Sequence, residues 1–117
     1  MNKRFYALGR MKKGKKNQTE QAFDDYLAAE KLAGRVYWYA FEKVKLQLAD
    51  NCFLTVDFFV MLEDRRLQAI DVKGSKYIIQ DDARVKMKVA AEEFPFEFYY
   101  AIPRTKKSGG GWEMVEV

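Results

Sequence analysis

Residues 52–74, CFLTVDFFVMLEDRRLQAIDVKG, contain two apolar segments separated by a short charged run. Residues 53–62 and 67–73 are rich in large apolar, aromatic and β-branched side chains, which predicts two strands. The run 63–66, EDRR, predicts the turn that joins these strands into a hairpin. Each predicted strand carries one aspartate among apolar neighbours, Asp57 in the first and Asp71 in the second.

Asp57 and Asp71 would lie side by side in this hairpin. A buried carboxylate without a partner costs on the order of several kcal/mol, so each aspartate needs a cation or a hydrogen-bond donor. Side chains alternate along a strand, which places Asp71 and Lys73 on one face with Cα atoms about 7 Å apart. The pattern predicts either a shared divalent cation with the Lys73 ammonium beside it or, more simply, a partly exposed ion pair between Asp71 and Lys73.

The residue composition restricts the kind of metal site. The chain has no histidine and one cysteine, Cys52, so it offers neither a Cys/His zinc site nor an internal disulfide. Oxygen ligands favour Mg²⁺ or Mn²⁺. We therefore expect either ion at the two aspartates.

A helix is predicted upstream, over residues 18–33, with an apolar stripe formed by Phe23, Tyr26 and Leu27. Helical spacing places Glu20 on the same inward face, which is an unusual position for a charged side chain. An alternative is that Glu20 closes a capping box with Asn17, which stands three residues before it. Residues 36–48 then predict a first strand, followed by a turn at Asp50-Asn51.

Downstream of the hairpin, residues 82–93 predict a second helix, with Asp81 as its N-cap and Pro95 preventing its continuation. Val85 and Val89 stand one turn apart and are expected to pack on the sheet. Residues 96–102 predict another strand, 104–111 a basic glycine-rich loop, and 112–117 an edge strand. The predicted fold is a mixed α/β domain with the element order α-β-β-β-α-β, in which helices flank a mixed sheet.

The length of 117 residues suits one domain, and the charge is unevenly spread along it. Residues 1–16 contain seven basic and no acidic residues, whereas the rest of the chain contains 14 basic and 17 acidic residues. We therefore divide the chain into a basic arm, 1–16, and a domain, 17–117. The arm would bind phosphates or serve only as a solubilising tail. No segment has the pattern of a secretion signal or a membrane span, so we expect a cytoplasmic protein that does not contact the membrane.

The spacing of these acids and the lysine resembles that of the PD-(D/E)xK nuclease superfamily. Within it, the chain is similar to phage and prophage endonucleases of the endonuclease I type, which resolve Holliday junctions. Residues 54–58, LTVDF, correspond to the Y-T-P-D-F segment of that family, and residues 71–74, DVKG, to its (D/E)-x-K-G motif. The match spans 17 to about 100, and Val56 departs from it by replacing the usual proline.

The resemblance implies a restriction-endonuclease-like core and a role for each site residue. Asp57 and Asp71 would bind the metal, Lys73 would be the catalytic lysine, and Glu20 would complete the metal site. The implied activity is Mg²⁺-dependent hydrolysis of DNA, with branched DNA or Holliday junctions in phage recombination or replication as substrates. Resolvases cut two strands symmetrically, which implies a homodimer.

Basic side chains complete the expected DNA surface. The candidates are Lys12, Lys13, Lys15, Lys16, Arg84, Lys86 and Lys88. Arg84 and Lys88 share one face of the second predicted helix, although they would equally suit its solvated side. Three other functions remain open: a nuclease without junction preference, a catalytically inactive DNA-binding module, and a phage accessory protein that binds no nucleic acid.

Overall fold

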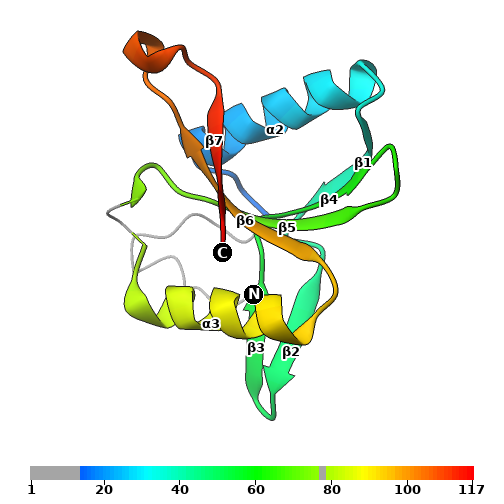
Figure 1. Cartoon of the computed structure of the whole chain (residues 1–117), viewed down its shortest axis with the longest axis vertical. Helices are drawn as coiled ribbons and strands as arrows, with labels where there is room; N and C mark the ends of the chain where they lie inside the picture. The colour runs from blue at the N-terminus through cyan, green and yellow to red at the C-terminus, as the bar shows by residue number, and fades with distance from the viewer. Residues whose placement is uncertain (1–13, 77–78) are drawn as a thin grey trace.

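A five-stranded mixed sheet with a helix on each face forms the body of the protein (Figure 1). The computed structural model describes residues 14–76 and 79–117. In chain order the described elements are α2 (Gln18–Leu32), β1 (Val36–Phe41), β2 (Lys45–Ala49), β3 (Cys52–Thr55), β4 (Phe58–Leu62), β5 (Leu67–Val72), α3 (Asp81–Glu93), β6 (Glu97–Pro103), the short 3₁₀ helix η2 (Lys106–Ser108) and β7 (Trp112–Glu116).

The strand order of the large sheet is β1-β4-β5-β6-β7. Strands β1, β4 and β5 are antiparallel neighbours, β6 lies parallel to β5, and β7 closes the sheet antiparallel to β6. The parallel pair requires a crossover, which α3 provides. When the two-stranded sheet of β2 and β3 is set aside, the order from α2 to β6 is the expected α-β-β-β-α-β, so the mixed α/β fold class is confirmed.

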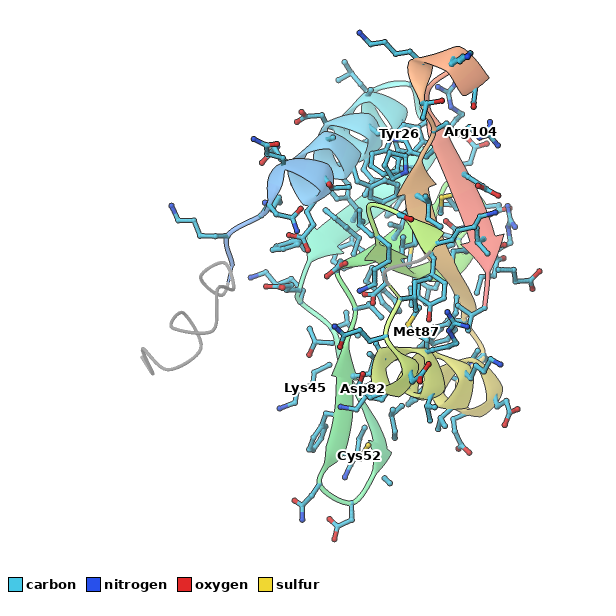
Figure 2. The ribbon with its side chains drawn as sticks, turned by 90° about the vertical axis from the view of Figure 1, so that its left-hand side faces the viewer. Tyr26, Lys45, Cys52, Asp82, Met87 and Arg104 are labelled. Atoms are coloured by element: carbon cyan, nitrogen blue, oxygen red, sulfur yellow. The ribbon has the colours of Figure 1, made fainter. Side chains whose placement is uncertain are left out.

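Two segments predicted as continuous strands are each broken in the middle. Residues 36–48 divide into β1 and β2, with Glu42 at a positive φ of 49° between them, and residues 53–62 divide into β3 and β4. The reason is that the two halves belong to different sheets: β2 and β3 pair only with each other and project away from the large sheet (Figure 2). The backbone N–H of Glu42 donates to the carbonyl of Asp57 at 2.8 Å and joins the two breaks.

Each face of the large sheet has its own apolar core. On one face, α2 buries Phe23 and Leu27 against strands β1, β4, β5 and β6. On the other, α3 buries Met87 and Ala90 against β4, β5 and β6 and against the small sheet. The small sheet is therefore held to the body by the second core, to which it contributes Leu46 and Leu54.

Helix α2 begins with the capping box that the sequence allowed. The side chain of Asn17 accepts from the Glu20 N–H at 2.8 Å, and the Glu20 carboxylate accepts from the Asn17 N–H at 2.9 Å. Both bonds satisfy N–H groups that a helix leaves without partners at its start. Of the predicted apolar stripe, Phe23 and Leu27 are buried and Tyr26 is 39% exposed.

The prediction that Val85 and Val89 face the sheet was wrong. Val85 is 58% and Val89 36% exposed, whereas Met87 has no exposed surface and lies on the side of α3 that packs on the core (Figure 2). Residues 87, 90, 91 and 94 repeat at helical spacing and pack on this core, so they form the inward stripe. Asp81 was also expected to cap this helix, but the N-cap is Gln80, which makes no side-chain capping bond.

Backbone hydrogen bonds shape the connection between β6 and β7. The N–H of Arg104 donates to the carbonyl of Gly111, and that of Gly110 donates to the carbonyl of Thr105, both at 2.9 Å. Gly109, Gly110 and Gly111 all have positive φ, between 67° and 98°, which is a conformation that only glycine adopts easily. The predicted glycine-rich loop therefore has a defined turn geometry.

No helix in the described parts of the chain is long and apolar enough to cross a membrane.

The inward stripe of α3 gives a direct test of the fold. Met87→Ala should lower the free energy of unfolding by about 2–5 kcal/mol, because it leaves a cavity in the core. Val85→Ala on the exposed side should change it by no more than about 0.5 kcal/mol. Urea titration followed by circular dichroism measures both values, and similar losses for the two variants would contradict this orientation of α3.

Candidate active site

Asp57 and Asp71 lie opposite each other at one end of the central strands. Phe58 of β4 pairs with Ile70 of β5, and one further step along this antiparallel register sets Asp57 opposite Asp71. Asp57 comes directly before β4, at the break that separates it from β3, and Asp71 is the penultimate residue of β5. The topology thus brings together the two aspartates that the sequence analysis selected.

Each aspartate binds the backbone of the opposite strand. Oδ1 of Asp71 accepts from the Asp57 N–H at 3.1 Å, and Oδ2 of Asp57 accepts from the Val72 N–H at 2.8 Å. These reciprocal bonds fix both carboxylates and replace regular strand pairing at this point. Oδ1 of Asp57 and Oδ2 of Asp71 stand outside these two backbone bonds.

Burial makes the two carboxylates difficult to ionise. Asp71 is 8% exposed and is the one charged side chain that is buried in the described part of the protein. Burial, and then the charge of Asp71, raise the pKa of Asp57 to about 8. Burial also raises the pKa of Asp71, against the opposing effect of the Lys73 ammonium. Without a bound cation, the pair therefore favours a protonated state at pH values where an ordinary aspartate is charged.

Lys73 stands directly after β5, with its ammonium on the side of Asp71. Its Nζ lies 3.7 Å from Oδ2 of Asp71, which is an ion pair but longer than a direct hydrogen bond. The backbone N–H of Lys73 donates to the carbonyl of Ala101 at 3.0 Å and fixes the residue beside β6. The simpler alternative from the sequence, a partly exposed ion pair at the strand end, describes this contact correctly, and a ligand could still reach the ammonium.

Glu20 lies near the pair, but its Oε1 serves the capping box of α2. Its charge raises the pKa of both Asp57 and Asp71, so the three carboxylates influence one another electrostatically. In residues 14–76 and 79–117, however, no three Asp, Glu, Cys or His side chains are placed to hold a metal together. The structure thus brings together Asp57, Asp71 and Lys73, and the role of Glu20 as a third ligand stays a prediction.

The two aspartates suit a hard divalent cation. Mg²⁺ is commonly bound by one or two carboxylates, with waters and substrate phosphate oxygens completing its shell. Oδ1 of Asp57 and Oδ2 of Asp71 are the oxygens outside the backbone bonds, and the raised pKa values show an electrostatic cost that a cation would relieve. By donor type and charge, the pair fits Mg²⁺ or Mn²⁺.

The basic residues proposed for DNA binding lie in different parts of the chain. Lys12 and Lys13 are outside the described residues. Lys15 is exposed, whereas Lys16 forms an ion pair with Asp24 at 3.2 Å and lies 4.7 Å from the centre of the Phe41 ring. Lys86 is exposed on α3, and Arg84 and Lys88 line one cavity, as their spacing of one helical turn suggested.

One hollow in the described part of the protein lies away from the aspartates. It measures about 820 Å³ and lies between α2 and β1, where Lys16, Lys31 and Lys43 line it. The aspartate pair is the stronger candidate site, because burial, hydrogen bonding and shifted pKa values coincide there.

Tyr100 is a residue that the sequence analysis did not assign to the site. It pairs with Asp71 across the parallel strands β5 and β6, and its hydroxyl is buried without a hydrogen-bond partner among the described residues. Burial, and then the charge of Asp71, raise the pKa of Tyr100. The sequence carries no direct signal for this residue, because the β5–β6 register depends on the crossover through α3.

Comparison of the chain with protein-family models, with curated proteins and with solved structures found no match.

The raised pKa values predict how the stability of the metal-free protein depends on pH. Between the ordinary aspartate pKa near 4 and a pKa of about 8, folded Asp57 retains a proton that the unfolded chain releases. The pair should therefore lower the free energy of unfolding as the pH rises through this window. Asp57→Asn keeps the acceptor for the Val72 N–H but removes the charge, so its melting temperature should fall less than that of the wild type between pH 5.5 and pH 8.

Thermal unfolding in EDTA at several pH values measures this difference. Asp50→Asn, a substitution in the exposed β2–β3 turn, is the matched control and should keep the wild-type slope. Equal slopes for wild type and Asp57→Asn would show that Asp57 ionises normally in the folded protein.

Proposed function

We propose that this chain is a metal-dependent DNA endonuclease that hydrolyses phosphodiester bonds at Asp57, Asp71 and Lys73. The observation that carries this proposal is the pair of buried carboxylates, held by reciprocal backbone bonds, with a lysine ammonium 3.7 Å from one of them. Two acids and one amine at a strand end provide both negative charge for a cation and positive charge for a phosphate.

Each residue has a separate task in this mechanism. Asp57 and Asp71 would hold Mg²⁺ or Mn²⁺ through the oxygens that their backbone bonds leave available. When bound, the cation supplies Lewis acidity, which polarises a phosphate oxygen and acidifies a water. The Lys73 ammonium would contact the scissile phosphate and stabilise the negative charge that grows on it in the transition state.

The fixed geometry of the carboxylates favours catalysis. Both are oriented by backbone N–H groups, those of Val72 and Asp57, so little reorganisation is needed when the substrate binds. Glu20 would act through its charge, or as a third ligand after a small displacement from its capping position.

DNA is the substrate that the basic residues favour. Lys15, Arg84, Lys86 and Lys88 are exposed, the chain has a net charge of +4, and its sequence pI is about 9.1. Branched DNA or a Holliday junction, a homodimer and a role in phage recombination within the host cytoplasm follow from the family resemblance and belong to this proposal. A nuclease acting on linear DNA without junction preference would use the same site.

The second candidate is a DNA-binding module without catalysis. It is favoured by one observation: Oε1 of Glu20 is engaged in the capping box, which leaves two rather than three carboxylates for a metal. This candidate predicts DNA binding that neither Mg²⁺ nor EDTA changes.

The decisive experiment is cleavage of a four-way junction, linear duplex and single strand, each with Mg²⁺ and with EDTA. The wild type should cut with Mg²⁺ only. Asp71→Asn should reduce the rate at least about 100-fold while the protein stays folded, because a nearly isosteric side chain loses the charge that holds the cation. Asp50→Asn should keep wild-type activity, and cleavage by Asp71→Asn at the wild-type rate would refute the ligand role.

Lys73 can be tested separately from the metal. Lys73→Ala should reduce turnover by about 10²–10³-fold, the usual effect of removing one group that stabilises transition-state charge. It should retain the rise in melting temperature that Mg²⁺ gives the wild type at pH 8, because the aspartates remain. A variant that chiefly loses its fold would instead show that Lys73 is a structural ion-pair partner of Asp71.

A further inference from the structure

A cavity of about 270 Å³ lies between α3 and the strands β6 and β7, and one of its lining residues, Tyr100, is the strand neighbour of Asp71. Figure 1 shows the end of β7 directed towards α3, with β6 next to it. Tyr100, Ile102 and Val115 form part of its mostly apolar wall, and Arg84 and Lys88 of α3 also line it. The volume is that of a small molecule rather than of a single water.

Tyr100 supplies a buried polar atom beside this cavity. This side chain is 5% exposed and lines the cavity, and its oxygen has no hydrogen-bond partner among the described residues. Buried hydroxyl groups are nearly always hydrogen-bonded, so an unpartnered one beside a cavity indicates a group that binds there. Tyr100 also pairs with Asp71 across strands β5 and β6, which makes the cavity a neighbour of the carboxylate pair.

The two cations that α3 contributes to the lining are available to a ligand. Arg84 and Lys88 stand one turn apart on α3, and neither forms an ion pair with a described residue. The third cation of the lining, Lys76, is instead paired with Glu113 at 3.1 Å. Glu116 also belongs to the lining, but it pairs with Tyr99, whose side chain packs with the core under α2, so the Glu116 side chain extends towards the opposite face of the sheet.

We infer that this cavity binds one unpaired nucleotide of the DNA next to the bond that is cut. The apolar wall would take the base, the Tyr100 hydroxyl would bind a polar atom on the base edge, and Arg84 and Lys88 would hold the phosphate. This inference rests on the proposed nuclease function. It adds a substrate class, DNA that contains an unpaired nucleotide. A base inside a duplex cannot enter a cavity unless it leaves the base stack.

The apolar wall decides between a nucleotide and a simple anion. A free phosphate would gain nothing from Ile102 and Val115, whereas a base gains from burying its faces and from stacking near an aromatic ring. The free-energy cost of unstacking is smallest for a nucleotide that is already unpaired, as at a branch point, a mismatch or a single-stranded end. DNA with such a nucleotide should therefore be the preferred substrate.

The first test measures binding of thymidine monophosphate, thymidine and inorganic phosphate to the full chain without metal, by amide chemical-shift titration. We expect the monophosphate to bind at least about tenfold more tightly than either fragment, since it uses both the apolar wall and the cations. Shifts should centre on residues of α3, β6 and β7 that line the cavity. Equal binding of inorganic phosphate would overturn the inference in favour of a plain anion site.

Variants then test the named contacts. Tyr100→Phe preserves the packing and should weaken monophosphate binding by about three- to tenfold, as the loss of one hydrogen bond does. The double variant Arg84→Gln/Lys88→Gln should weaken it more than tenfold, whereas Lys31→Gln on α2, across the sheet, should leave it unchanged. An unchanged affinity for Tyr100→Phe would overturn the assignment of its hydroxyl and indicate that a water occupies the cavity.

A cleavage assay separates this inference from the proposed function. Wild type should cut a duplex with one unpaired nucleotide faster than the fully paired duplex, and Tyr100→Phe should reduce this preference. Mg²⁺-dependent cleavage with no such preference would overturn the cavity inference and leave the nuclease intact. Monophosphate binding in the cavity without any cleavage would support the cavity and refute the nuclease.

Discussion

The reciprocal bonding of Asp57 and Asp71 is the constraint on which the rest of the structure depends. Each carboxylate accepts from a backbone N–H of the other strand, so the two acids join β4 to β5 where regular pairing stops. Asp57 also stands where the chain leaves the small sheet for the large one, and its carbonyl accepts from Glu42 at the matching break. The bonds around Asp57 therefore position the candidate site. They also fix the point at which the chain turns from the large sheet into the small sheet that packs on α3.

This arrangement concentrates electrostatic cost at one place in an otherwise apolar interior. Apolar cores cover both faces of the large sheet, and the aspartate pair lies at the end of its central strands between them. Replacing the pair with neutral side chains would suit folding better than keeping it. The retention of two acids and a lysine there is understandable if they bind a cation and a phosphate, which is the physical basis of the proposal.

The sequence predicted the parts of the fold that depend on local pattern. The hairpin of β4 and β5, both helices and the approach of Asp57 to Asp71 follow from alternation and spacing within residues 52–74 and their neighbours. The strand breaks could not be predicted, because β-type alternation continues through Glu42 and Val56 although the chain changes sheet there. The inward face of α3 was misassigned because it carries two apolar stripes, and only packing against the small sheet selects Met87 over Val85. Tyr100 was missed because its position depends on the β5–β6 register.

The three glycines before β7 influence where one residue of the cavity wall lies. Val115 lines the cavity, but the strand that carries it is directed by Gly109, Gly110 and Gly111, all of left-handed backbone geometry. A side chain at any of these positions would meet no neighbouring atom, so crowding is not what requires glycine. The left-handed backbone of these residues, together with the loop hydrogen bonds and the pairing with β6, sets the course of β7. The shape of this wall therefore depends partly on residues at the start of the strand that lie outside the cavity lining.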